Sequence, residues 1–287
     1  MATLKAIRRR IASVRSTQQI TRAMKLVAAS KLRRAQEALV HARPYHEALR
    51  RVADSLLLSV PEVTAAPEGA KRESLIVIVS SDRGLCGGYN ANVIRAAEET
   101  ARKARGDDLE AKFFAVGRKS LEHIRRTRQP LDGERINNVP RMATVGLARE
   151  LAAHVLTRWR AGELTEAGVV YSSFRSALSQ RPLYERLLPV TRPAESSPTG
   201  EREYLVEPSA AELVPVVLRR YLEASMLHAL LEADASFFGA QMTAMDSATN
   251  NAVEMISRLT LEMNRARQAT ITRELMDIVG GAEALRS

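Results

Sequence analysis

The sequence has one cysteine and no long apolar run. With Cys86 as its only cysteine, the chain can form neither an internal disulfide nor a zinc site built from several thiolates, and a reducing compartment is favoured. The longest purely aliphatic run, Leu75 to Val79, is far too short to cross a bilayer. Aromatic residues make up only 4% of the chain, whereas Ala, Leu, Arg and Glu are abundant, which favours helix.

Acidic residues are absent from residues 1–36, which carry ten Lys and Arg side chains. The whole chain has a net charge of +10, so the remaining residues sum to zero. The basicity therefore belongs to one element and its partner. The composition of this stretch also resembles a mitochondrial transit peptide, but its apolar periodicity continues well beyond a removable presequence.

No glycine occurs before Gly69, and apolar residues recur at alternating spacings of three and four from Leu4 to Leu56. This pattern predicts one amphipathic helix over about residues 3–58, about 80 Å long at 1.5 Å per residue. Pro44 is expected to kink this helix without ending it.

The apolar stripe of this helix is interrupted at Gln18, Thr21 and Lys25. Apolar residues on a neighbouring face are expected to replace them there: Ile20, Met24 and Val27. We therefore expect the packing of the helix to loosen or rotate at this level.

The middle of the chain alternates between strand and helix patterns after a linker rich in Pro and small residues at 59–74. Strands are expected at 75–80, 111–117, 135–140, 166–174, 182–190 and 202–208. Helices are expected at 87–105, 118–128 and 144–162. This alternation predicts an α/β domain of Rossmann-like type with a largely parallel sheet.

A second long helix is expected after a capping box formed by Ser209 and Glu212, with Gly280 and Gly281 marking its end. Its apolar pattern continues to Ala266. Two amphipathic helices whose ends are tied to one domain can pair as an antiparallel coiled coil. The expected organisation is an N-terminal helix at 1–60, an α/β domain at 70–207 and a C-terminal helix at 208–287.

The motif SSDRGLCGGYN follows the first expected strand, where nucleotide-binding folds place a phosphate loop. Its glycines, Gly84, Gly87 and Gly88, do not have the spacing of a known phosphate loop, so a structural strand-to-helix turn is favoured over a nucleotide cradle. No histidine has a recognisable relation to Cys86 that would make it a nucleophile. The sequence therefore predicts no catalytic, cofactor-binding or metal-binding residues.

Three segments together resemble the signature blocks of the F-type ATP synthase gamma subunit family. They are LKAIRRRIASVRSTQQITRAMKLVAASKLRRAQ, SSDRGLCGGYNANV and MTAMDSATNNAVEMISRLTLEMNRARQATITRELMDIVGGAEAL. The resemblance implies a central rotor stalk that couples proton-driven c-ring rotation to the catalytic beta subunits and regulates ATPase activity and proton flow. It implies a non-catalytic subunit, peripheral on the cytoplasmic side of a bacterial inner membrane.

The resemblance also implies partners for particular residues. Contacts with the ring of alpha and beta subunits are expected at Arg8, Arg9, Met24, Lys25, Arg267, Gln268 and Thr272. Contacts with the c-ring and the epsilon subunit are expected at Tyr204 and Glu207, where the motif is less specific.

Two other classes of function remain open from the residues themselves. A basic coiled-coil protein that binds nucleic acid would use the same arginines on phosphates and would show a steep salt dependence. An enzyme built on the α/β domain would bind nucleotide through Gly87 and Gly88. Charge and spacing alone do not choose between these alternatives.

Overall fold

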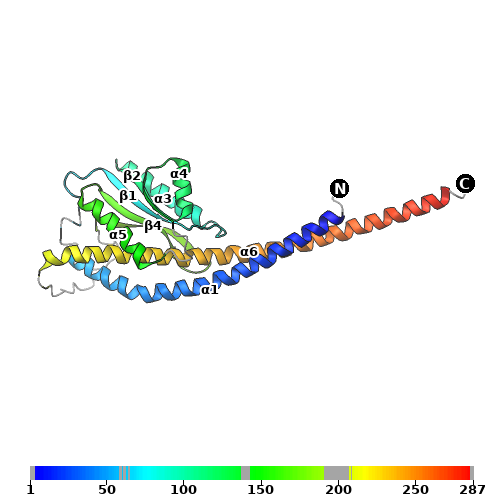
Figure 1. The fold of residues 1–287 in the computed structure, drawn as a ribbon, viewed down its shortest axis with the longest axis horizontal. Coiled ribbons are helices and arrows are strands. Elements are labelled where there is room, and N and C mark those ends of the chain that lie inside the picture. The colour runs from blue at the N-terminus through cyan, green and yellow to red at the C-terminus, as the bar shows by residue number, and fades with distance from the viewer. Residues whose placement is uncertain are drawn as a thin grey trace. The chain divides into compact units, whose positions relative to one another are not determined.

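A computed structural model describes residues 4–57, 60, 63, 65–136, 143–190, 207 and 209–284. The chain forms two compact units (Figure 1). The helix-pair unit comprises Met1–Val27 with Met242–Ser287, and the α/β unit comprises Ala28–Gln241. The two long terminal helices, α1 (Leu4–Leu56) and α6 (Ala210–Ala284), each contribute to both units.

The α/β unit is built on a five-stranded mixed sheet with strand order β3-β2-β1-β4-β5. Strands β1 to β4 are parallel, and β5 pairs antiparallel with β4. The strands are β1 (Glu73–Val79), β2 (Glu110–Val116), β3 (Leu131–Arg135), β4 (Glu166–Phe174) and β5 (Gln180–Leu188). The shorter helices are α3 (Tyr89–Gly106), α4 (Arg118–Thr127) and α5 (Val145–Arg160). The predicted α/β class is therefore confirmed.

One predicted strand was wrong in position. The strand expected at 135–140 is instead β3, whose Leu131 pairs with Phe113 of β2, and Ile136 lies outside it. The rest of the expected strand, residues 137–140, lies outside the described residues, as does all but residue 207 of the strand expected at 202–208. The β3 sequence LDGER has no apolar alternation because it lies at the edge of the sheet, so pattern analysis gives little signal there.

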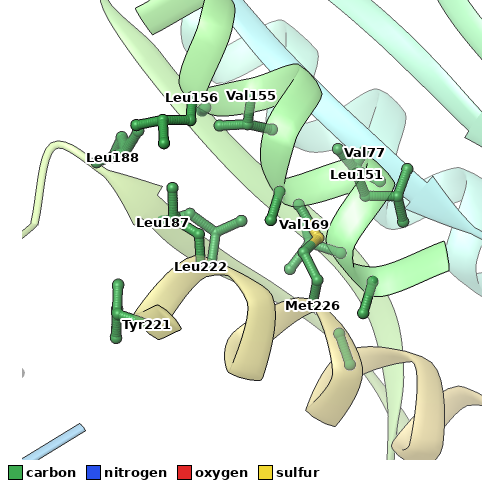
Figure 2. Close-up of a cluster of buried hydrophobic side chains, with 14 of the residues drawn as sticks. Val77, Leu151, Val155, Leu156, Val169, Leu187, Leu188, Tyr221, Leu222 and Met226 are labelled. Atoms are coloured by element: carbon green, nitrogen blue, oxygen red, sulfur yellow. The ribbon is translucent and has the colours of Figure 1, made fainter. Parts of the chain in front are cut away.

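The core of the α/β unit lies between the sheet, α5 and the part of α6 that belongs to this unit (Figure 2). Val77 of β1 and Val169 of β4 face Leu151 of α5, while Leu222 and Met226 of α6 point into the same cluster. Burying each of these side chains contributes about 1.5–3 kcal/mol. This contact is the apolar basis on which α6 packs against the sheet.

The α6 helix changes character along its length. Residues 229–239 are all buried, whereas residues 267–279 are all exposed. Residues 229–239 are therefore surrounded by neighbours on all sides, and the polar residues among them need hydrogen-bond partners.

The ends of α6 only partly follow the sequence signals. The predicted cap is confirmed, because the Ser209 hydroxyl oxygen accepts the Glu212 backbone N–H at 3.3 Å. The helix also continues through Pro215, as α1 continues through Pro44. The predicted stop at Gly280 and Gly281 was wrong, since α6 runs to Ala284. Glycine lowers helix stability by about 1 kcal/mol without excluding the helix.

Candidate functional site

The SSDRGLCGGYN loop connects β1 to α3, and several of its polar groups bond within the loop, while Asp82 Oδ1 accepts the Arg118 backbone N–H at 2.8 Å. Asn90 Oδ1 accepts the Ser81 backbone N–H at 3.0 Å, and Asn90 Nδ2 lies 3.2 Å from the Cys86 sulfur. The Ser81 hydroxyl donates to the Arg83 carbonyl oxygen at 2.6 Å. These bonds support the structural role expected for the loop over a nucleotide cradle.

The Cys86 side chain is buried, and burial raises the pKa of its thiol. A raised pKa keeps the thiol protonated and therefore poorly nucleophilic. Its neighbours Leu85 and Gly87 adopt left-handed backbone conformations, with φ values of 62° and 56°. Within the described ranges, no group of His, Cys, Asp and Glu side chains could hold a metal ion.

In the helix-pair unit, α1 has two distinct faces near its N-terminus. Ile7 and Ile11 are buried and cluster with Leu259 of α6. Arg8 and Arg9, which lie between them in sequence, are exposed. The apolar stripe of α1 thus faces α6, while its charged side chains remain available to a partner.

A polar layer lies between α1 and α6 further along this unit. Lys25 Nζ donates to Asp246 Oδ1 at 2.6 Å, and the Thr249 hydroxyl lies 2.8 Å from the Thr21 hydroxyl oxygen. The Thr21 and Thr249 hydroxyls also lie within hydrogen-bond distance of the Gln18 and Met245 carbonyl oxygens of their own helices. We define these residues, Thr21, Lys25, Asp246 and Thr249, as the polar layer.

The polar layer corrects the expectation that the stripe shifts to a neighbouring face. Thr21 is buried, whereas Ile20 and Val27 are more than half exposed. Met24 is half-buried. The stripe therefore keeps its face at this level, because Thr21 and Lys25 each find a polar partner on α6.

The C-terminal segment of α6 carries the other expected ring contacts. Arg267, Gln268 and Thr272 are exposed, and the Thr272 hydroxyl donates back to the Gln268 carbonyl oxygen at 3.0 Å. Large apolar side chains on the same segment are also exposed: Ile271, Leu275, Met276, Ile278 and Val279. The structure thus places these three residues on an accessible surface of the helix-pair unit.

The structure describes one of the two residues expected to contact the c-ring and the epsilon subunit. Glu207 is exposed. Tyr204 lies outside the described residues. The assignment of these two residues to the c-ring and the epsilon subunit therefore stays a prediction.

Two groups of largely buried polar residues were not predicted from the sequence patterns. His46 of α1 and His228 of α6 stack in parallel, with ring centroids 4.3 Å apart. Glu232 and Asp234 are almost fully buried on α6. Their one trace in the sequence is the stretch LLEADASFF, in which two carboxylates stand among apolar residues.

Comparison with known families finds relatives along the whole chain. A family model described as ATP synthase matches residues 3–285. The ATP synthase gamma chain of Moorella thermoacetica is 46% identical, covering all of both chains. The chain belongs to the ATP synthase gamma family.

Other relatives agree with this membership. The ATP synthase gamma chain of Geobacter metallireducens is 44% identical, again over the full length of both chains. A central stalk and c-ring structure of Tetrahymena thermophila mitochondrial ATP synthase contains a chain that is 27% identical, with a TM-score of 0.60. The match covers 80% of this chain and 99% of that one. A chain of the Euglena gracilis mitochondrial ATP synthase shares the fold, with a TM-score of 0.70 at 19% identity over 98% of this chain and 94% of that chain.

These relationships confirm the resemblance found in the sequence and support the central stalk role. They give no support to the nucleic-acid alternative. In the part of the chain that the structure describes, no helix is both long and apolar enough to span a bilayer.

Proposed function

We propose that this chain is the central rotor stalk of an F-type ATP synthase, coupling c-ring rotation to the catalytic cycle of the beta subunits. The observation that carries this proposal is the 46% identity to a gamma chain over the full length of both proteins. In this role the chain catalyses no reaction itself, and it regulates ATPase activity and proton flow through its contacts. It acts as a peripheral protein on the cytoplasmic side of a bacterial inner membrane.

In this proposal, α1 and α6 form an antiparallel coiled coil, and a Rossmann-like domain is inserted between them. The corresponding parts are the N-terminal helix at 1–60, the α/β domain at 70–207 and the C-terminal helix at 208–287. The buried contact of Ile7 and Ile11 with Leu259 supports such pairing in the helix-pair unit. A two-helix shaft resists bending with few residues, which suits a rotating element.

The alpha and beta subunits are proposed to surround the exposed face of the helix-pair unit. The residues assigned to this contact are Arg8, Arg9, Met24, Lys25, Arg267, Gln268 and Thr272. Diffuse charge attraction from exposed arginines would centre the shaft without locking it in one orientation. Lys25 also forms an intramolecular ion pair, so its contribution to a partner contact depends on the exposed 39% of its side chain. Tyr204 and Glu207 are assigned to the c-ring and the epsilon subunit.

Coexpression tests this function directly. When produced with alpha and beta subunits from the same source, the chain should enter a complex in single copy, and the complex should hydrolyse ATP. Alpha and beta subunits coexpressed without the chain provide the control. Failure of the chain to enter any stable complex would overturn the proposed function.

Site-directed cross-linking tests the assigned contacts. A photoreactive maleimide can be attached to single cysteines placed at Arg9, Gln268 and Glu207, because native Cys86 is buried. In the assembled complex, the probes at 9 and 268 should label alpha or beta subunits. The probe at 207 should label epsilon or c subunits, and the reverse pattern would contradict the assignment.

A further inference from the structure

Within the α/β unit, α6 is held by hydrogen bonds as well as by apolar packing. Glu232, Asp234 and Ser236 are at most 5% exposed, although all three are polar. Each bonds to the backbone of a segment outside α6. We define these three residues as the α6 key.

Two members of the key bond to the end of β4. Glu232 Oε2 accepts the Phe174 backbone N–H at 2.5 Å. The Ser236 hydroxyl donates to the Ser172 carbonyl oxygen at 2.7 Å. Since they are four residues apart, Glu232 and Ser236 lie on one face of the helix.

The third member holds another face of the same helix turn. Asp234 Oδ2 accepts the backbone N–H of Ala143, just before α5, at 3.1 Å. At 3.6 residues per turn, Asp234 lies about 200° around the helix from Glu232, on roughly the opposite side. Hydrogen bonds therefore hold α6 on two sides, from β4 on one side and from the segment before α5 on the other.

A fourth contact comes from the start of α3. The Tyr89 hydroxyl donates to the Ala233 carbonyl oxygen at 3.3 Å. Burial, together with the charge of Asp234, raises the pKa of Tyr89, which keeps the hydroxyl protonated as a donor. Close to the key, a Cβ added to Gly239 would lie 3.3 Å from the Phe174 ring, so the β4–β5 hairpin approaches α6 closely.

We infer that the α6 key fixes the rotational position of α6 against the α/β domain, so that torque passes between them without slippage. Apolar packing has little directional preference, and a helix held by it alone can settle into more than one ridge-and-groove arrangement. Hydrogen bonds require defined distances and angles, and those to carboxylates are about twice as strong as neutral ones. Bonds on opposite faces of one turn oppose rotation of the helix in either direction.

This inference rests on the proposed stalk function and assigns positioning residues for it. The test uses the complete synthase in membrane vesicles and measures protons pumped per ATP hydrolysed. The double variant Glu232→Met and Asp234→Leu removes both acceptors. We expect it to pump several-fold fewer protons per ATP hydrolysed, while hydrolysis itself is retained. Glu232→Gln with Asp234→Asn keeps an acceptor oxygen at each position and should retain most of the coupling.

A matched control separates positioning from general destabilisation. Met226→Ala removes a fully buried α6 side chain from the same contact without touching a hydrogen bond. It should lower the thermal stability and the amount of assembled complex, while leaving the pumping ratio of the assembled complex unchanged. An equal loss of coupling in this variant would overturn the inference, as would normal coupling in the double variant without acceptors.

A cross-link keeps the inference testable if the double variant does not assemble. A Cβ at Gly239 would lie 3.5 Å from the Ala177 Cα, so cysteines at these two positions would be close neighbours that oxidation can be used to link. If the α6 key holds α6 still against the α/β domain, a covalent link between them adds no further restraint. Oxidation of the double variant Ala177→Cys and Gly239→Cys, in an otherwise native chain, should therefore leave coupling intact. Inhibition on oxidation and recovery on reduction would overturn the inference. Failure of the native chain to join alpha and beta subunits would instead refute the proposed function.

Discussion

Lys25 of α1 and Asp246 of α6 form an ion pair between two residues that are far apart in the sequence, with Nζ and Oδ1 2.6 Å apart. The side chains are 39% and 45% exposed, so solvent screens much of their attraction. When a charged pair lies within a largely apolar contact between two helices, only one alignment of the helices brings the two charges together. The pair therefore contributes more to the alignment of the helices than to stability.

Reversing either charge of this pair should lower stability, and reversing both should restore it. Lys25→Glu or Asp246→Lys alone places like charges together, and we expect each to cost up to about 1 kcal/mol because the site is partly exposed. The double reversal should recover most of that loss. Urea denaturation of the four proteins measures the coupling, and strictly additive losses would contradict a specific pair.

The sequence could predict which face of α1 packs against α6, but not how that face continues through the polar layer. A lysine and a threonine interrupt an apolar period, and nothing local shows that Asp246 and Thr249 will stand opposite them. The pairing of residues more than 200 positions apart is a tertiary fact. The error in placing Ile20 and Val27 at the contact has this physical origin.

The buried polar groups show a similar limit within the α/β unit. The strand β4 was predicted with the bounds observed, and α3, α4 and α5 were predicted to within two residues of theirs. The roles of Glu232 and Asp234 were not predicted, since a carboxylate on a long helix is usually solvated. Only the folded chain brings the backbone N–H groups of Phe174 and Ala143 to them.

Neutralising the exposed arginines of α1 should weaken assembly while leaving folding intact. Arg8→Gln, Arg9→Gln and Arg10→Gln remove three exposed charges beside the buried Ile7 and Ile11. Surface substitutions of this kind change stability by less than about 0.5 kcal/mol. The midpoint of thermal unfolding should therefore stay the same, while association with alpha and beta subunits becomes slower and less sensitive to salt.

A substitution on the buried face of the same helix provides the control for this prediction. Ile11→Ala should lower the stability of the helix-pair unit by about 2 kcal/mol or more, because a buried side chain is truncated. An arginine variant that assembles at the native rate and salt dependence would contradict the charge argument.

The stacked His46 and His228 should make the α/β unit less stable in acid. Burial, the neighbouring His228 and the charge of Arg50 lower the pKa of His46 to about 4, and burial also lowers the pKa of His228. The charged groups that act on the pair come from α1, α6 and β5: Arg43, Arg50, Glu232 and Glu185.

The direction of the pH effect follows from these lowered values. Below about pH 6.5 the unfolded chain binds protons that the folded chain does not, so stability is full above this pH and falls as the pH drops toward 4. For His46 alone the loss is of order 3 kcal/mol, at about 1.4 kcal/mol per pKa unit. Urea denaturation between pH 4.5 and 7.5, about the range set by these values, measures it.

Variants of the histidine pair distinguish this source of pH dependence from others. His46→Phe with His228→Phe retains two stacked rings without titratable groups, and its stability should change less over the same pH range. His41→Gln alters an exposed histidine of the same helix and should leave the pH dependence as it is. An unchanged slope in the double phenylalanine variant would contradict the prediction.

Removing the Arg158 side chain should strongly destabilise the α/β unit. Its guanidinium bonds to Glu73, Asp132 and Glu163 while its side chain is only 13% exposed. Burial alone would raise the pKa of Asp132, but its bond to His154 and the charge of Arg158 keep that pKa below its usual value. Arg158→Met removes one partner from each of the buried carboxylates Glu73 and Asp132, which keep Lys112 and His154, and the expected loss is about 3 kcal/mol by urea denaturation. Arg33→Met breaks an exposed pair on α1 and should cost less than about 0.5 kcal/mol, so a similar loss in both variants would show that burial does not control the strength of these pairs.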